Sequence, residues 1–222
     1  AEDPFIRPLG YHTAAYFFES AKVAAALGGD FKMMAIKERL VWLYEVEPNQ
    51  IMAFFVLRAD TQERPRDPAP ILHEAFDDLG WVVPEVLAKM PEPGEIYYDV
   101  VAQIAMPRWH DKRVVLIGDA AHAVSLMAGQ GASLAIAGGR ALGQAMTGAS
   151  DIDAALERFE TQLRPLVLDK QQAGRRMADW FVPKSNRHVW LRDLTVNVMN
   201  WPPLAGLIGR YFAVSPKGFS LR

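Results

Sequence analysis

The residues best suited to chemistry lie in one short stretch, residues 114–131, which reads VVLIGDAAHAVSLMAGQG. An apolar run leads into Gly118-Asp119, and a loop of small residues then leads to Gly129-Gln130-Gly131. An ionised carboxylate only accepts hydrogen bonds, so it suits the hydroxyl groups of a ligand. Glycines before a helix allow a flat ligand to approach the free N–H groups of the first helical turn.

The order of these features along the chain indicates one kind of ligand. Residues 113–119 read as a continuously apolar strand, the type that is buried in a parallel sheet, and open α/β sheets bind ligands beyond the carboxyl ends of such strands. The helix that begins at Ala132 or Ser133 has a positive N-terminal end, which favours anionic character. A polyol at one end and a flat, potentially anionic group at the other describe a flavin with its ribityl chain. Each feature alone is weak, since Gly-Asp after a strand is more often a turn.

The first hundred residues are predicted to form a sheet with short helices. Tightly spaced runs rich in aromatic and β-branched residues predict antiparallel strands, with turns at 37–38 and 47–49. The predicted strands are 11–19, 32–36, 39–46, 50–58 and 95–106, and short helices are predicted near 69–79 and 84–90. The polar, proline-broken segment 61–68 is predicted to be a loop.

The rest of the chain is predicted to be mainly helical after the strand at 113–119. A helix over 132–146 contains Gly138-Gly139, which indicates close packing against another backbone. A long helix begins at an Asp151 cap and is interrupted or kinked near Pro165, and shorter helices follow at 187–199 and 203–212.

These elements predict a mixed α/β (α+β) fold. It combines an antiparallel sheet with short helices, an α/β unit made of the strand, loop and helix over residues 113–146, and C-terminal helices. The predicted domains are 1–107 for the sheet, 108–170 for the flavin unit and 171–222 for the helical end.

Composition narrows the classes of function. The 222 residues include no cysteine and carry a net charge of −2, which excludes disulfides and thiolate sites and argues against nucleic acid as a partner. A cytoplasmic location is the simplest expectation, because no signal or spanning segment is evident. Residues 164–222 hold 10 Lys/Arg against 3 Asp/Glu and include Trp180, Trp190, Trp201, Tyr211 and Phe212. Such a tail can lie on a membrane surface, although helices that pack their aromatic side chains inward explain it more simply.

The joint pattern resembles a known family. RVVLIGDAAH followed by GQG and an alanine-rich helix is similar to the second flavin motif of the para-hydroxybenzoate hydroxylase-type FAD-dependent monooxygenases. The resemblance implies that Asp119 holds the ribityl hydroxyls and that backbone amides near Gly129 lie at the pyrimidine edge of the flavin. The full set of cofactor-binding residues that it implies is Gly118, Asp119, His122, Leu126, Gly129, Gln130, Gly131, Ala132 and Ser133.

The sequence also departs from the family pattern. The family commonly has prolines where Val124 and Leu126 stand and an acidic pair where Ala137-Gly138 stands. The Gly-x-Gly-x-x-Gly turn that holds the ADP half of FAD does not occur in these residues. We therefore interpret the chain as the C-terminal portion of such an enzyme, with the N-terminal half of the FAD domain supplied in cis or in trans.

The implied reaction uses FAD with NADH or NADPH as the reductant to hydroxylate an aromatic or other electron-rich small molecule. No catalytic acid–base pair and no metal site is predicted. Two alternatives stay open: a non-catalytic binding or interaction module, and a related flavin enzyme such as a halogenase. The substrate walls are predicted to be aromatic and apolar residues of the first sheet, although such a face is more often core. They are Trp42, Met52, Phe54, Phe55, Tyr97 and Tyr98.

Overall fold

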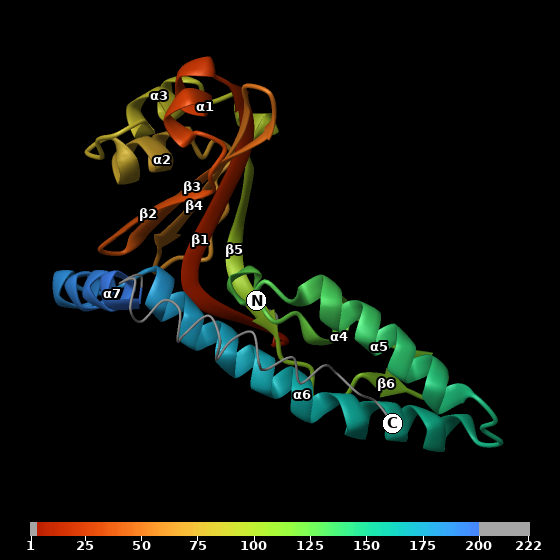
Figure 1. Cartoon of the computed structure of the whole chain (residues 1–222). Coiled ribbons are helices and arrows are strands. Elements are labelled where there is room, and N and C mark those ends of the chain that lie inside the picture. The colour runs from red at the N-terminus through yellow and green to blue at the C-terminus, as the bar shows by residue number, and fades with distance from the viewer. Residues whose placement is uncertain (1–3, 200–222) are drawn as a thin grey trace.

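Five antiparallel strands form the upper part of the molecule, in the order β2-β3-β4-β1-β5 (Figure 1). The computed structural model describes residues 4–199. The strands are β1 (Ile6–Glu19), β2 (Lys32–Ile36), β3 (Arg39–Glu47), β4 (Gln50–Arg58) and β5 (Tyr97–Ile104). The predicted antiparallel sheet is therefore confirmed, and the two predicted turns are formed with Glu38 and Asn49 at φ of 63° and 65°.

The two faces of this sheet have different neighbours. One face is covered by α1 (Ala21–Leu27), α2 (Ala69–Phe76) and α3 (Val83–Ala88), and it carries the main apolar core, which includes Tyr16 and Phe55. The opposite face, here called the lower face, carries side chains that alternate with those of the core. The register aligns these lower-face residues across the strands: Thr13, Ala15, Trp42, Phe54, Tyr97 and Asp99.

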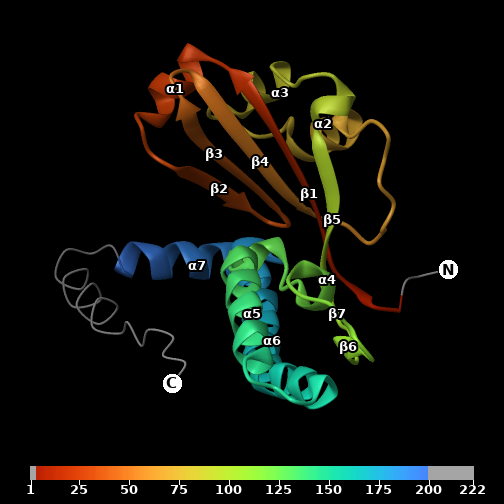
Figure 2. The ribbon, with the colours of Figure 1, turned by 90° about the vertical axis from the view of Figure 1, so that its right-hand side faces the viewer.

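A helical layer lies beneath the lower face (Figures 1 and 2). Its main helices are α5 (Gly131–Met146), α6 (Ile152–Phe181) and α7 (Asn186–Met199), with the single turns α4 (Asp119–His122) and η2 (Leu126–Ala128) before them. The carboxylate of Asp151 caps α6 by accepting from the N–H groups of Asp153 and Ala154, as predicted. Pro165 lies inside α6 without ending it. Met127, Ala178 and Val182 of this layer pack against Tyr11, Phe54 and Val56 of the sheet.

The strand predicted at residues 113–119 differs from the observed structure. Only β7 (Val114–Val115) is strand, and it pairs antiparallel with β6 (His110–Asp111) in a separate two-stranded ribbon. Within residues 4–199 no neighbouring strand lies parallel to this segment, so its backbone cannot continue a ladder. Val114 and Ile117 are accordingly 66% and 44% exposed, and Gly118-Asp119 begins α4 instead of ending a strand.

Smaller differences concern the ends of elements and the C-terminal region. A 3-10 turn, η1 (Pro93–Glu95), precedes β5, and α2 ends at Phe76, three residues before its predicted end. Trp180 and Trp190 are exposed at the surface, while Trp201, Tyr211, Phe212 and the helix predicted at 203–212 lie outside the described residues. No helix among residues 4–199 combines the length and the apolar character that crossing a membrane requires.

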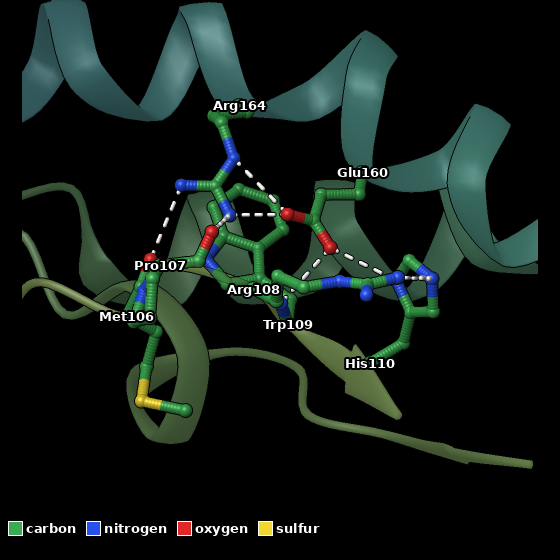
Figure 3. Close-up of polar contacts among 7 residues, drawn as sticks. All are labelled: Met106, Pro107, Arg108, Trp109, His110, Glu160 and Arg164. Atoms are coloured by element: carbon green, nitrogen blue, oxygen red, sulfur yellow. Dashed lines mark hydrogen bonds and ion pairs between the residues drawn. The ribbon is translucent and has the colours of Figure 1, made fainter. Parts of the chain in front are cut away.

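A buried carboxylate joins α6 to the β6–β7 ribbon (Figure 3). Oε2 of Glu160 accepts from the backbone N–H of Trp109 and from Nδ1 of His110, each at 2.9 Å. Oε1 accepts from Arg164, whose guanidinium also donates to the carbonyls of Met106 and Pro107 and lies 4.7 Å from the centre of the Trp109 ring. Burial alone would raise the pKa of Glu160, but these donors outweigh it and hold the pKa below its usual value.

Replacing this carboxylate should destabilise the fold in a pH-dependent way. Because a hydrogen bond to a charged group contributes about 1.5–3 kcal/mol, we expect Glu160→Gln to lower the free energy of unfolding at pH 7 by about 2 kcal/mol. The pKa of Glu160 is lower in the folded state, so its contribution is complete above the ordinary value of 4.5 and is lost as the pH falls through the folded pKa. Urea unfolding at pH 7 and at pH 3.5 should show the difference between wild type and variant shrinking in acid. Glu157→Gln, on the exposed side of α6, is the control, and an equal loss in both variants would contradict the assignment.

Candidate functional site

A pocket of about 530 Å³ lies between the lower face of the sheet and the segment that joins α4 to α5. Thr13 of β1 and residues 97 and 99–102 of β5 form the sheet side. Asp119, residues 123–126 and residues 129–132 form the opposite side. A somewhat larger cavity of about 600 Å³ lies near the β2–β3 turn and α2, but its walls contain none of the residues that the sequence singles out.

The pocket brings most of the predicted flavin residues together. Asp119, Leu126, Gly129, Gln130, Gly131 and Ala132 line it. Gly118, His122 and Ser133 do not line it, although each is adjacent in sequence or space to residues that do. Of the predicted substrate residues only Tyr97 lines the pocket. The sequence therefore located the loop side of the pocket more accurately than the sheet side.

The N-terminus of α5 faces this pocket without a cap. Its N-cap residue, Gln130, makes no side-chain capping hydrogen bond, and its first turn has no acidic residue. The N–H groups of the first turn have no acceptor within the helix, so the pocket wall carries free donors and a partial positive charge. A Cβ atom at Gly131 would lie 3.5 Å from Oδ1 of Asp119, which places the carboxylate directly beside this helix end. A flat ligand could donate from its hydroxyl groups to the carboxylate of Asp119 and accept at its carbonyl groups from the N–H groups of α5.

Two glutamines hold the loop of the pocket in place. Nε2 of Gln103, on β5, donates to the carbonyls of Val124 (3.0 Å) and Gln171 (2.8 Å). Nε2 of Gln171, on α6, donates to the carbonyls of Ile104 (2.8 Å) and Ala123 (3.1 Å). Both glutamine side chains are buried, so these bonds are not in competition with water. The loop is thereby tied to the sheet and to α6 at the same time.

The loop also depends on a close approach at Gly174. A Cβ atom there would lie 2.9 Å from the carbonyl oxygen of Val124 and 3.2 Å from Cβ of Ala128. Ser125, which follows Val124, has φ of 81° and a buried side chain. Its Oγ accepts from the N–H of Met127 at 3.2 Å. A non-glycine residue with such a positive φ costs about 1–3 kcal/mol, which the surrounding hydrogen bonds must offset. No local pattern in the sequence indicates the roles of Gly174, Gln103 and Gln171, because these roles depend on contacts between distant segments.

His122 is placed away from the pocket. Its ring is buried, lies 4.9 Å from the centre of the Trp109 ring, and points Nε2 toward Gly138 of α5. Burial lowers its pKa, and Nε2 has no hydrogen-bond partner. The predicted close packing at Gly138 is present, but the neighbours are the side chains of His122 and Leu163 and not a backbone, and Gly139 faces open space.

The predicted substrate residues of the sheet divide between its two faces. Trp42 and Phe54 stack at 5.0 Å on the lower face, where Met52 packs against the same cluster, but none of the three lines the pocket. Phe55 and Tyr98 belong to the opposite face, where Phe55 contacts Phe76 in the core. The hydroxyl of Tyr98 lies 2.7 Å from Nδ1 of the buried His12.

Asp99 is the charged residue on the sheet side of the pocket, and the sequence analysis did not single it out. Its carboxylate accepts from Nε of Arg64 at 2.6 Å and from the hydroxyl of Tyr97 at 3.4 Å. The pKa of Tyr97 is raised mainly by burial and to a smaller extent by the negative charge of Asp99. This hydroxyl therefore keeps its proton at neutral pH. Among the described residues, no group of His, Asp and Glu side chains has an arrangement that could hold a metal ion.

Residues 17–163 match the FAD binding domain family. A flavin-dependent monooxygenase from an unknown prokaryotic organism is 33% identical over 149 residues, which are 63% of this chain and 37% of that protein. A flavin-dependent monooxygenase of Legionella longbeachae is 32% identical over 114 residues, 51% of this chain and 29% of that protein. The chain thus spans well under half the length of these relatives.

Solved structures agree with this result. Tetracycline destructase Tet(55) superposes with a TM-score of 0.72 and 25% identity, over 87% of this chain and 53% of that one. Klebsiella pneumoniae HpxO, solved in complex with FAD and uric acid, gives a TM-score of 0.72 and 25% identity, over 86% of this chain and 50% of that one.

Gly174→Ala should disturb the loop of the pocket. The added methyl group cannot be accommodated unless the backbone at Val124 moves, so we expect the free energy of unfolding to fall by about 1–3 kcal/mol. Gly143→Ala is the matched control, because it lies in α5 with no atom near its Cβ position. That change should stabilise the protein by up to about 1 kcal/mol through helix propensity. Urea unfolding of both variants measures the contrast, and stabilisation by both would show that the close approach is absent.

Gly138→Ser should supply a hydrogen-bond partner to Nε2 of His122, which has none in the structure. A Cβ atom at this position lies 3.5 Å from Nε2, so a serine hydroxyl is within reach of it. We expect Gly138→Ser to unfold with a free energy about 0.5–1 kcal/mol higher than Gly138→Ala, although alanine has the better helix propensity. Urea unfolding at pH 7.5 compares the two variants. A more stable alanine variant would show that Nε2 does not need a partner there.

Proposed function

Because the chain belongs to the FAD binding domain family, we propose that its pocket holds the isoalloxazine and ribityl parts of FAD. The observation that carries this proposal is the uncapped N-terminus of α5 beside the carboxylate of Asp119 in one pocket wall. A side chain at residue 131 would occupy the space where the two groups meet. The arrangement fits a ligand that has hydroxyl groups at one end and a flat, polar ring at the other.

Each group in the wall has a task in this proposal. Asp119 accepts hydrogen bonds from the ribityl hydroxyls. The N–H groups of the first turn of α5, together with its dipole, stabilise negative charge at the pyrimidine edge of the ring. Gln103 and Gln171 fix the loop, so these donors do not have to reorganise when charge develops. His122 is a structural residue behind this wall in our proposal, because its ring is directed at Gly138.

We further propose that the protein is an FAD-dependent monooxygenase that hydroxylates an aromatic or other electron-rich small molecule, with NADH or NADPH as the reductant. The bound flavin supplies the redox and oxygen chemistry, and the chain positions it and excludes water. The names of the relatives and the FAD bound in HpxO support this proposal. The substrate would enter between the flavin and the lower face of the sheet, where Tyr97 and Asp99 line the pocket.

The adenosine end of FAD requires further contacts in this proposal. The 222 residues contain no Gly-x-Gly-x-x-Gly turn, so we propose that polypeptide outside them binds the ADP half, in cis or in trans. The predicted domain boundaries at residues 107 and 170 remain proposals as well. α6 runs without interruption across residue 170, so this helix connects the flavin unit to the C-terminal helices.

Titration of the chain with FAD tests the proposal. We expect saturable quenching of FAD fluorescence and a shifted visible spectrum, because the pocket transfers the ring out of water. Asp119→Ala should weaken binding by about 10–100-fold, since it removes hydrogen bonds to a charged acceptor. Asp169→Ala removes an exposed carboxylate from α6 and is the control. Equal binding of FAD by Asp119→Ala and Asp169→Ala would contradict the assignment of Asp119, whereas a folded chain that binds no FAD would show that the polypeptide for the ADP half is indispensable.

A further inference from the structure

The charged groups that line the pocket are all acidic. Asp99 comes from the sheet and Asp119 from α4, and the lining contains no lysine or arginine. Two arginines near the lower face are directed at residues outside the pocket lining, and Arg64 bonds to Asp99 from outside the lining. Arg58 donates to the hydroxyl of Tyr11, and Arg175 donates to Oε1 of Gln103. A ligand in this pocket therefore meets two carboxylates and no side-chain cation.

Asp99 has one oxygen with capacity for a further donor. Oδ1 is occupied by Nε of Arg64 at 2.6 Å and by the backbone N–H of Val100 at 2.7 Å. Oδ2 has only the long contact of 3.4 Å from the Tyr97 hydroxyl. The Arg64 side chain is 60% exposed and does not line the pocket, whereas the Asp99 side chain is 35% exposed and does. Water therefore screens the guanidinium charge more strongly than it screens the carboxylate.

The remaining walls suit a flat apolar ring. The Tyr97 ring and the side chains of Val101, Val124 and Leu126 surround the two carboxylates. A volume of about 530 Å³ falls within the usual range of sites for small molecules, which combine apolar walls with a few polar groups that fix orientation. The charged group on the sheet side of this pocket is the carboxylate of Asp99, which only accepts hydrogen bonds.

We propose that Asp99 determines substrate specificity: the pocket takes a flat aromatic molecule that donates an O–H or N–H group to Oδ2 of Asp99, and it rejects aromatic carboxylates. This inference rests on the proposed function, in which Asp119 and the N-terminus of α5 serve the flavin and leave Asp99 for the substrate. A carboxylate on the ligand would lose its hydration and face like charges, with no side-chain cation to replace its solvent partners. A phenol or an amine would instead satisfy the free oxygen.

Three naphthalene probes of the same ring size test this specificity. They are 2-naphthol, which donates a hydrogen bond, 2-methoxynaphthalene, which does not, and 2-naphthoate, which is anionic. Ligand-observed NMR titrations with the 222-residue chain at pH 7, with and without FAD, measure the affinities. With FAD at the N-terminus of α5, we expect 2-naphthol to bind about tenfold more tightly than 2-methoxynaphthalene, and 2-naphthoate to bind more weakly than both.

Variants assign the preference to Asp99. Asp99→Asn removes the charge and should raise the affinity for 2-naphthoate several-fold while leaving 2-methoxynaphthalene unchanged. Asp30→Asn removes one charge from an exposed turn and should leave the order of the probes unaltered. Thermal unfolding checks that each variant is folded.

Several outcomes would overturn the inference. These are binding of 2-naphthoate as tight as that of 2-naphthol, an affinity for 2-naphthoate that is unchanged in Asp99→Asn, or no binding of any probe by the folded chain. The result is independent of the FAD titration. If Asp119→Ala leaves the affinity for FAD unchanged but the order of probes holds, the flavin assignment is wrong and the specificity of the pocket stands. If FAD binds and the order reverses, only the specificity is wrong.

Discussion

The pair of buried amides formed by Gln103 and Gln171 is the contact on which the site depends. These side chains connect β5, the loop at residues 123–124 and α6 through four hydrogen bonds to backbone carbonyls. The loop cannot form a regular ladder of its own, because Ser125 has φ of 81° and the neighbouring residues belong to single turns. A buried carbonyl without a partner costs about 1–3 kcal/mol. Gln103 supplies a donor to the carbonyl of Val124, and Gln171 adds a second donor to the carbonyl of Ala123, which also accepts from the N–H of Ile104.

The direction of α5 follows from this anchor. The loop ends at Gly129, from which the chain turns directly into the first turn of α5. Since α4 begins at Gly118 with φ of 61°, Asp119 is carried toward the same helix end. Acidic and donor groups therefore meet at one wall, while the sheet contributes Tyr97 and Asp99 from the other side. The pocket is an interface between two layers, and neither layer contains it alone.

The sequence predicted the local features of this protein well and its long-range contacts poorly. Apolar runs of strand length predict β2 and β4 at their observed bounds, and the Asp151 cap marks the start of α6. The prediction of a parallel-type strand at 113–119 was wrong, because such a strand needs neighbours that residues 4–199 do not provide. Glycine spacing identified the loop wall of the pocket, but Asp99, Gln103 and Gly174 give no local signal. Their importance arises from the approach of segments that are about 20 to 70 residues apart.

The contacts along α6 have a consequence for how this chain can vary in evolution. Buried residues of α6 recur at intervals of three or four residues and so form a single stripe along the helix: Glu160, Leu163, Val167, Gln171, Gly174 and Ala178. Glu160 at one end bonds to His110 of the β6–β7 ribbon, Gln171 bonds to the carbonyl of Ile104 in β5, and Ala178 at the other end packs against the sheet. Inserting or deleting one residue between Glu160 and Gln171 would rotate one end of the stripe by about 100° relative to the other. Related chains can therefore replace residues on the solvent side of α6 freely, while the length of this helical segment has to be preserved.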